Sequence, residues 1–352
     1  MSGTRRPVGV VLMTYGSAST AEDIPTYLRS VRHGRDPSPE LIDEFTARYR
    51  RIGFSPLVRI TMAQGQALQE DLDSRHGRGS FRVEVGMLHS EPRVAAALER
   101  FAAAGVCRVI GVVLAPQYSP LILAGYHREM EAAAHLLGAD GEVSIAEAWG
   151  DQPALIEAMA SRTREAIASL PEESRWDAPI VFTAHSLPKP VVDRDPGYID
   201  QLKQTASLVA QAAHLRPGRW QFAYQSAGHT PEEWLRPDLK ELLPGMHRDG
   251  VRDVIVVPVQ FIADHLETLY DIDVAAVEEA AEDGITMRRI PALNTAADFI
   301  AALAAVVERE HEAVGTTTRQ PVGTSPASST GPHPYDGRGA AHQPVDDMTA
   351  IM

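Results

Sequence analysis

Cysteine is almost absent from this 352-residue chain, which contains only Cys107. A single thiol cannot form a disulfide within the chain, complete a four-thiolate zinc site or hold an iron–sulfur cluster by itself. We therefore expect no [2Fe–2S] cluster, and we expect a reduced, cytoplasmic setting.

Long apolar runs and an excess of positive charge are also missing. No stretch of about 18 apolar residues occurs, so we expect no integral membrane segment. Arg5 and Arg6 precede the apolar residues 8–13 in the manner of a signal sequence, but this short run fits a first buried strand better. The formal net charge of −14 argues against a nucleic-acid partner.

The common nucleotide-binding and hydrolase motifs are absent too. There is no Gly-x-x-x-x-Gly-Lys-Ser/Thr, and the Gly-x-Gly at 77–79 does not open a helix after a strand. Neither Gly-x-Ser-x-Gly nor His-Glu-x-x-His occurs. Any metal must therefore be held by imidazole, carboxylate or phenolate groups, which suit Fe²⁺ bound loosely enough to be passed on.

What the chain does contain is an alternation of strand-like and helix-like segments. With 44% hydrophobic and 23% charged residues, it is long enough for two domain-sized cores. The alternation predicts an α/β protein with parallel sheets. Its strands are expected near residues 8–13, 81–87, 108–114, 180–183, 220–224, from 254 onward and 286–290.

A faint internal duplication predicts two related halves. Residues 11–17 resemble 181–186, and residues 112–117 resemble 255–260. We expect an N-terminal domain over residues 1–150 and a C-terminal domain over 151–314. Residues 315–352 are rich in Gly, Pro, Ser, Thr and His without hydrophobic periodicity, and we expect a disordered tail there.

Residues 254–273 combine a strand with an acidic helix. The β-branched run from Val254 predicts a strand buried on both faces. Helical spacing is expected from Phe261 onward, which would place Asp264, Glu267 and Asp271 on one side of a helix. Carboxylates at the C-terminal end of a parallel strand lie where open α/β sheets build their sites. The alternative is a solvated acidic first turn, favoured by the helix dipole.

A second strand ends in a histidine. The apolar residues 180–183 lead to His185, and Pro188 stops the segment. Taken alone, such a histidine is more often structural. Together with the carboxylates of residues 254–273, it predicts an open site for a divalent metal or a proton-transfer pair.

The N-terminal region offers a tyrosine and an arginine-rich segment. Gly16 allows a sharp turn after the first strand and exposes Tyr15, which alternatively is a half-buried lid over the sheet edge. Residues 29–59 carry seven arginines against four acids, a local net charge of +3. Arginine favours carboxylates and phosphates, so a small polyanion is one interpretation. A solvated helix face with scattered ion pairs is the other.

These segments, taken together, resemble the ferrochelatase family. The resemblance covers residues 8–314, and Tyr15 makes it most similar to the coproporphyrin III ferrochelatases of Gram-positive bacteria. It is carried by Leu12-Met13-Thr14-Tyr15-Gly16, Arg48-Tyr49-x-x-Ile52-Gly53, Ser55-Pro56-Leu57, Leu114-Ala115-Pro116-Gln117-Tyr118-Ser119, Thr183-Ala184-His185-Ser186-Leu187-Pro188, Tyr224-Gln225-Ser226-Ala227-Gly228 and Asp264-His265-Leu266-Glu267-Thr268-Leu269-Tyr270-Asp271.

The resemblance implies two Rossmann-like, chelatase-type domains, each a parallel sheet flanked by helices, with a porphyrin cleft between them. It implies that His185 and Glu267 are the catalytic residues and the metal ligands on one side of the macrocycle, with Tyr15 on the other. Asp271 would continue an acidic path for the metal. The porphyrin-binding residues would be Tyr15, Arg32, Arg48, Tyr49, Ser55 and Tyr126.

The implied activity is insertion of Fe²⁺ into coproporphyrin III, which gives coprohaem in haem biosynthesis. Fe²⁺ would be a substrate, with no permanently bound cofactor. Arg32 and Arg48 could anchor propionates of the porphyrin. The resemblance also implies a monomer, and a protein that receives coprohaem is a possible transient partner. The alternatives are the same reaction on protoporphyrin IX, or a haem or metal carrier without turnover.

Overall fold

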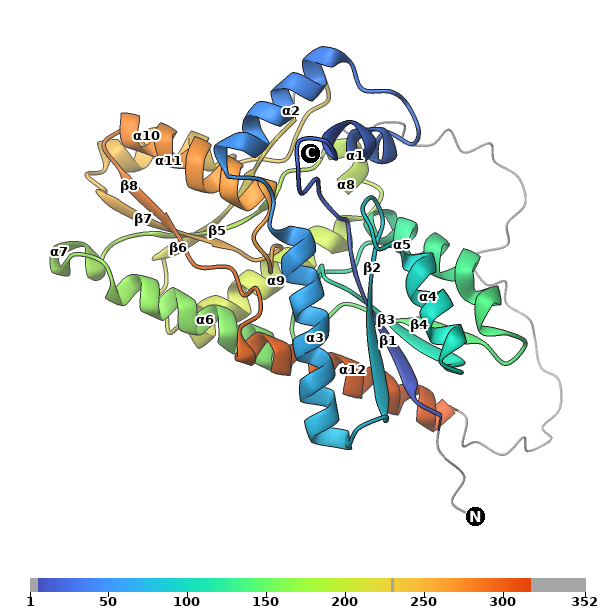
Figure 1. Cartoon of the computed structure of the whole chain (residues 1–352). Helices are drawn as coiled ribbons and strands as arrows, with labels where there is room; N and C mark the ends of the chain where they lie inside the picture. The colour runs from blue at the N-terminus through green and yellow to red at the C-terminus, as the bar shows by residue number, and fades with distance from the viewer. Residues whose placement is uncertain (1–5, 229–230, 318–352) are drawn as a thin grey trace, which may run out of the picture.

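Two four-stranded parallel sheets form the centre of the molecule, as a computed structural model of residues 6–228 and 231–317 shows (Figure 1). The first sheet has the strand order β2-β1-β3-β4, and the second has the order β6-β5-β7-β8. The strands are β1 (Val8–Thr14), β2 (Phe81–Met87), β3 (Arg108–Val113), β4 (Glu142–Ile145), β5 (Ile180–His185), β6 (Trp220–Gln225), β7 (Asp253–Pro258) and β8 (Thr286–Arg289). The predicted fold class is confirmed.

Helices flank both sheets. Those of the first half are α1 (Ile24–Val31), α2 (Pro39–Arg51), α3 (Leu57–His76), α4 (Val94–Ala103), α5 (Pro120–Ala133) and the 3₁₀ helix η1 (Ala134–Leu137). Those of the second half are α6 (Pro153–Ala168), α7 (Glu172–Arg175), α8 (Lys189–Val192), α9 (Pro196–Ala212), α10 (Leu239–Arg248), the π-helix η2 (Glu267–Ala276), α11 (Val277–Glu282) and α12 (Ala297–Thr317). None of the helices within these described ranges has the length and apolarity needed to span a bilayer.

The central strands are buried on both faces. Every residue of β1, β5 and β7 is buried, because helices cover each side of the sheet. This explains why their sequences read as unbroken apolar runs rather than as alternating ones. The strand predicted from Val254 is therefore confirmed.

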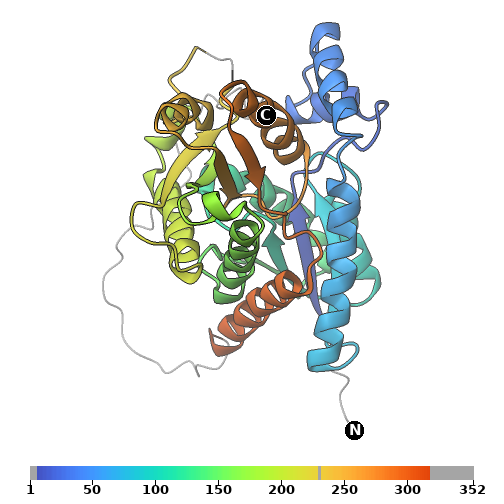
Figure 2. The ribbon, with the colours of Figure 1, turned by 90° about the vertical axis from the view of Figure 1, so that its left-hand side faces the viewer.

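One apolar core connects the two sheets. It includes Val10 and Leu12 of β1 together with Phe182 of β5 and Val257 of β7. In both views α1 and α2 lie at one end of the molecule and α12 at the other (Figures 1 and 2). Helix α12 packs against α3 and α6, so the last helix contacts elements of both halves.

Several boundaries differ from the prediction. Strand β4 was not predicted, because it is only four residues long and none of its residues is fully buried. Helix α12 continues to Thr317, past the predicted end at Val314. The rest of the predicted tail, residues 318–352, lies outside the described residues, and the domain boundary near residue 150 stays a prediction.

Candidate functional site

A cavity that is open to solvent lies where the central strands of both sheets end. Thr14 and Tyr15 enter it from the end of β1, and Leu114 enters it just after β3. His185 enters it from the end of β5, and Gln260 enters it after β7. The carboxyl ends of parallel strands are the usual place for a site in an open α/β sheet.

The cavity walls are mostly apolar and aromatic. Four ionisable groups of the lining come from the second half of the chain. The apolar and aromatic lining consists of Tyr15, Tyr27, Tyr49, Leu57, Leu114, Ala115, Ile122, Tyr126, Leu187, Phe261, Ile262, Ala263 and Leu266. The ionisable lining from the second half consists of His185, His265, Glu267 and Asp271. Such a cavity suits a large, flat, apolar ligand that is acted on by a few polar groups.

His185 has a defined tautomer. Its side chain is 3% exposed, and its Nδ1 lies 2.5 Å from the carbonyl oxygen of Ser186. A carbonyl only accepts hydrogen bonds, so Nδ1 carries the hydrogen and the neutral ring has its lone pair on Nε2. That Nε2 atom is buried and has no hydrogen-bond partner. It is therefore available as a base or as a metal ligand.

Glu267 lies between two imidazoles. Its Oε2 is 4.0 Å from Nε2 of His185 and 3.7 Å from Nε2 of His265. Burial would raise the pKa of Glu267, but the neighbouring imidazoles of His185 and His265 outweigh burial and lower it. Glu267 is also the first residue of η2, where the helix dipole favours a negative charge. The carboxylate is therefore ionised at neutral pH.

His265 is a second imidazole in the cavity, and the sequence did not single it out as a site residue. Its Nδ1 donates to the carbonyl oxygen of Ala263 at 2.9 Å, so its Nε2 also faces Glu267. Burial would lower the pKa of His265, but the neighbouring carboxylate of Glu267 raises it. The sequence pointed to His265 only by its position, two residues before Glu267 in the acidic segment 254–273.

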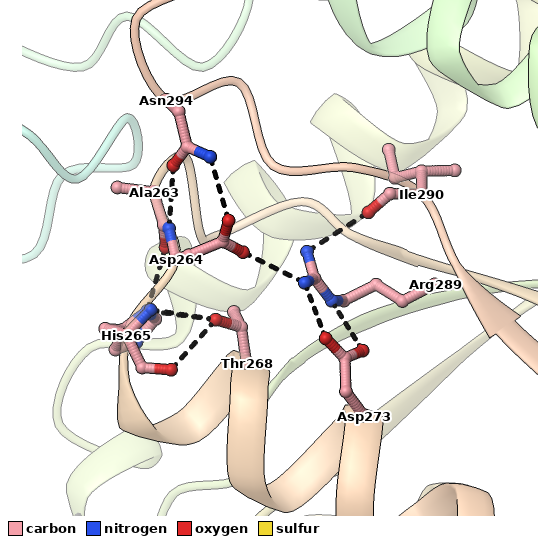
Figure 3. A network of polar contacts seen from close by, with 8 residues as sticks. All are labelled: Ala263, Asp264, His265, Thr268, Asp273, Arg289, Ile290 and Asn294. Carbon is pink, nitrogen blue, oxygen red and sulfur yellow. Dashed lines mark hydrogen bonds and ion pairs between the residues drawn. The ribbon is translucent and has the colours of Figure 1, made fainter. Parts of the chain in front are cut away.

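The predicted acidic face is only partly correct. Glu267 and Asp271 both line the cavity, and Asp271 accepts a 2.5 Å hydrogen bond from Ser226. Burial, and then the charge of Glu267, raise the pKa of Asp271. Asp264 instead bonds to Arg289 and Asn294 (Figure 3), and the helix begins at Glu267 rather than at Phe261. Residues 261–265 are non-helical, so Asp264 does not continue the helix face.

Tyr15 enters the cavity beside a second aromatic ring. The ring centroids of Tyr15 and His89 are 4.3 Å apart, with an interplanar angle of 57°. Burial, followed by the charge of Glu267, raises the pKa of Tyr15, so its phenol is neutral. Gly16 has φ of 94°, and a Cβ there would lie 2.6 Å from Oγ of Ser90, so only glycine fits this turn.

The other predicted porphyrin-binding residues divide into two groups. Arg48, Tyr49 and Tyr126 line the cavity. Arg32 follows α1 as its C-cap, and Ser55 precedes α3, where its Oγ accepts from the backbone N–H of Leu57 at 3.3 Å. Neither Arg32 nor Ser55 is among the residues that line the cavity. The structure thus brings six of the eight predicted site residues together, namely Tyr15, Arg48, Tyr49, Tyr126, His185 and Glu267.

Arg48 is the arginine among the residues that line the cavity. Its Nη2 lies 2.5 Å from Oε1 of Glu44, and its guanidinium lies 5.6 Å from the ring centroid of Tyr270. Only 26% of its side chain is exposed, so the guanidinium is held at the cavity by its neighbours. It is placed to bind an anionic group of a ligand.

The ionisable groups are arranged for proton transfer and transient metal contact. Within residues 6–228 and 231–317, no group of three or more His, Cys, Asp or Glu side chains forms a complete metal-binding cluster. His185 and Glu267 instead offer one free imidazole nitrogen and one ionised carboxylate to the same space. An acidic N–H placed in that space can lose its proton to Nε2 of His185, with Glu267 stabilising the imidazolium.

The chain is similar to known proteins over most of its length. The ferrochelatase family model matches residues 7–311. A ferrochelatase of Deinococcus radiodurans is 40% identical over 307 residues, which cover 87% of this chain and 96% of that protein. The coproporphyrin III ferrochelatase of Bacillus subtilis is 34% identical, covering 86% of this chain and 98% of that protein.

A solved structure shares the fold. SirB from Bacillus subtilis, determined with Fe³⁺, superposes with a TM-score of 0.54 at 12% sequence identity. The match covers 89% of this chain and 98% of SirB. At this identity the likeness concerns the arrangement of the two sheets and their helices.

Proposed function

This chain belongs to the ferrochelatase family and is a porphyrin metal chelatase, and from this premise we propose that it inserts Fe²⁺ into coproporphyrin III to form coprohaem. The observation that supports the site most strongly is the free Nε2 of His185, 4.0 Å from the carboxylate of Glu267 in an apolar cavity. The choice of coproporphyrin is supported by relatives of that name, which are 34–37% identical to this chain.

The proposed reaction exchanges two pyrrole protons for one Fe²⁺ ion. Nε2 of the neutral His185 takes the two pyrrole protons one after the other and passes each to the solvent to which the cavity is open, while Nδ1 stays bonded to the carbonyl of Ser186. The charge of Glu267 favours the resulting imidazolium. After the protons have left, Nε2 of His185 and the carboxylate of Glu267 are transient ligands of the incoming metal. His265 and Asp271 extend the line of ionisable groups along the cavity.

The cavity walls would distort and hold the macrocycle. Tyr15, Tyr49 and Tyr126 present largely buried rings to the ligand, and Tyr49 is fixed by a 2.9 Å hydrogen bond between its hydroxyl and Oγ of Ser17. A bent porphyrin exposes its nitrogen lone pairs, and the energy for bending comes from binding elsewhere on the ring. Tyr15 would face the side of the macrocycle opposite to His185, where its neutral hydroxyl is positioned to ligate the iron of the product.

The propionates would contact the arginine-rich segment. Coproporphyrin carries four propionates, and Arg48 lines the cavity with its guanidinium held by Glu44 and Tyr270. Arg32 lies at the end of α1, whose Tyr27 lines the same cavity, so we propose Arg32 as an outer anchor. Ser55, at the start of α3, would contribute by shaping the loop before Leu57.

Anaerobic insertion assays with two substrates test the proposal. The protein is incubated with Fe²⁺ and an equal concentration of coproporphyrin III or protoporphyrin IX, and the absorption spectrum is followed. We expect coproporphyrin to be metallated faster, because only it offers four carboxylates to the arginines. A clear preference for protoporphyrin would contradict the proposed substrate but not the chelatase activity.

A haem or metal carrier is the alternative of a different class. A carrier needs ligands such as His185 and Tyr15 but has no need of a base paired with a carboxylate. The arrangement of Glu267 between two imidazoles therefore favours turnover. A carrier would bind coprohaem without converting the free porphyrin. The monomeric state, the cytoplasmic location and a coprohaem-receiving partner stay predictions.

A further inference from the structure

A partly buried polar network joins Asp264 and Asp273, on either side of Glu267 in the chain, to Arg289 and Asn294 (Figure 3). Arg289, on the last strand β8, bonds to Oδ1 of Asp264 at 2.9 Å and to both carboxylate oxygens of Asp273 at 2.9 and 2.7 Å. Asn294 binds the same aspartate twice, accepting from the N–H of Asp264 at 2.9 Å and donating to its Oδ2 at 2.8 Å. Both hydrogen-bonding edges of Asp264 are thus fixed.

The network connects the catalytic segment to the first half of the chain. The N–H of Asn294 donates to the carbonyl of Ile262 at 2.9 Å, and Gln64 of α3 donates to the carbonyl of Asn294 at 2.7 Å. Asn294 adopts φ of 45°, a left-handed conformation that asparagine tolerates better than most residues. The residues before Glu267 are therefore held by contacts from both halves of the chain.

Arg289 contacts two aspartates, one on each side of Glu267 in the chain. Asp264 lies before η2, and Asp273 lies six residues after Glu267 within it. A π-helix closes hydrogen bonds from i to i+5, so each turn holds more residues than an α-turn and each residue sweeps a smaller angle. If this segment refolded as an α-helix, Asp273 would rotate around the axis relative to Glu267. The bidentate pair with Arg289 would then be lost.

The ion pairs of Arg289 are partly buried. The side chain of Arg289 is only 8% exposed, whereas those of Asp264 and Asp273 are 22% and 35% exposed. Burial would lower the pKa of Arg289, but Asp273 and then Asp264 raise it, so the guanidinium stays charged. Buried ion pairs add little net stability compared with apolar contacts, although they are sensitive to position. The two ion pairs of Arg289 are therefore suited to fixing the conformation of the segment between Asp264 and Asp273.

We propose that Arg289 is a positioning residue for metal insertion: by joining Asp264 to Asp273, it keeps η2 in its π-helical form with the carboxylate of Glu267 facing His185. The inference rests on the catalytic role proposed for Glu267. Arg289 itself does not line the porphyrin cavity, so its effect is on the geometry of insertion rather than on porphyrin binding.

Two variants and a matched control test this role. Asp273→Asn removes one side of the bridge at a partly exposed position and leaves the Asp264–Arg289 pair in place, and Arg289→Gln removes both sides. Arg288→Gln is the control, because the neighbouring Arg288 pairs with Asp253 at 2.5 Å, away from η2. The readouts are kcat for iron insertion, Kd for metal-free coproporphyrin III, the melting temperature and amide hydrogen exchange of residues 266–276.

We expect kcat to fall by about 10-fold in Asp273→Asn and more in Arg289→Gln, since a displacement of about 1 Å can cost up to about 100-fold in rate. The porphyrin Kd should change by less than about three-fold, and amide exchange in residues 266–276 should accelerate. Arg289→Lys should be intermediate, because an ammonium cannot form the two-pronged contact. Arg288→Gln should leave kcat within about two-fold of wild type, because the partner of Arg288, Asp253, belongs to β7 and not to η2.

An unchanged kcat in Asp273→Asn would overturn the inference, as would a Kd that rises as much as kcat falls. If Arg289→Gln does not fold, Asp273→Asn decides the question alone. Failure of the wild-type protein to insert iron would instead contradict the proposed function, so the two outcomes are distinguishable.

Discussion

At the scale of residues, the two histidines next to Glu267 differ in one important respect. Both donate from Nδ1 to a backbone carbonyl, but Nε2 of His185 is the buried atom without a hydrogen-bond partner. Burial would lower the pKa of His265, but Glu267, 3.7 Å away, raises it. We propose His185, whose Nε2 is free, as the base and His265 as a neighbour that holds the carboxylate of Glu267 in place.

Replacement of His185 by alanine should abolish turnover without abolishing binding. His185→Ala removes the free Nε2 but leaves the aromatic walls and Arg48 intact, so we expect kcat to fall by at least about 100-fold, the lower range for loss of a general base. Porphyrin affinity, measured by fluorescence quenching, should change by less than about three-fold. Retained turnover would exclude His185 as the base.

His89 should make stability depend on pH. Burial, and then Arg93 and His33, lower the pKa of His89 to about 4 from its usual 6.5. The unfolded chain, in which His89 has its usual pKa, therefore binds a proton more readily than the folded protein. The contribution of neutral His89 to the free energy of unfolding is present above pH 6.5 and is lost as the pH falls toward 4. When the pH falls from 7 to 4, the free energy of unfolding should decrease in both proteins. The decrease should be about 2 to 3 kcal/mol smaller for His89→Gln than for wild type. Parallel urea-denaturation profiles for the two proteins would contradict this assignment.

At the scale of elements, α3 positions one wall of the cavity. Its first turns supply Leu57 and Thr61 to the lining, and Gly65 allows the helix to lie close to β2. A Cβ on Gly65 would lie 2.7 Å from a methyl carbon of Val85. The distance between α3 and the sheet is therefore set by the absence of a side chain.

Gly65→Leu should push α3 away from the sheet. We expect a loss of about 1 to 3 kcal/mol in the free energy of unfolding, typical of overpacking. Porphyrin affinity should also fall, because Leu57 and Thr61 move with the helix. Ala63→Leu, at an exposed position of the same helix, is the control and should change neither quantity appreciably. Equal effects of the two substitutions would show that the close packing at Gly65 is unimportant.

The elements also show where sequence reasoning succeeds and where it stops. The strands ending at Tyr15 and His185 were predictable because apolar runs buried on both faces have a strong local pattern. The π-helical form of η2 was not, because acids spaced for one helix face do not distinguish i+4 from i+5 hydrogen bonds. Asp264 was misplaced because its partners, Arg289 and Asn294, lie 25 and 30 residues further along the chain.

At the scale of the whole molecule, the two sheets share one core. Phe182 of the second sheet belongs to the same apolar cluster as Leu12 of the first. The buried Gln117 also joins the halves, donating to Oγ1 of Thr205 at 3.0 Å and to the carbonyl of Val259 at 3.2 Å. These contacts keep Tyr15 and His185, which come from different sheets, at a fixed separation. The cavity is therefore a property of the joined pair of sheets.

We expect the two sheets to unfold as one unit. Because the shared core would be exposed if either half opened, urea unfolding followed by circular dichroism and by tryptophan fluorescence should give coincident transitions. Trp149, which is 1% exposed within that core, reports on its opening. Two separated transitions would show that the halves are independently stable domains.

A crystal structure with bound metal-free coproporphyrin III tests the central claim most directly. We expect the macrocycle to occupy the cavity with His185 and Glu267 on one face, Tyr15 on the other, and Nε2 of His185 directed at the pyrrole nitrogens. A porphyrin bound outside the cavity, or one whose nitrogens lie out of reach of both His185 and Glu267, would contradict it.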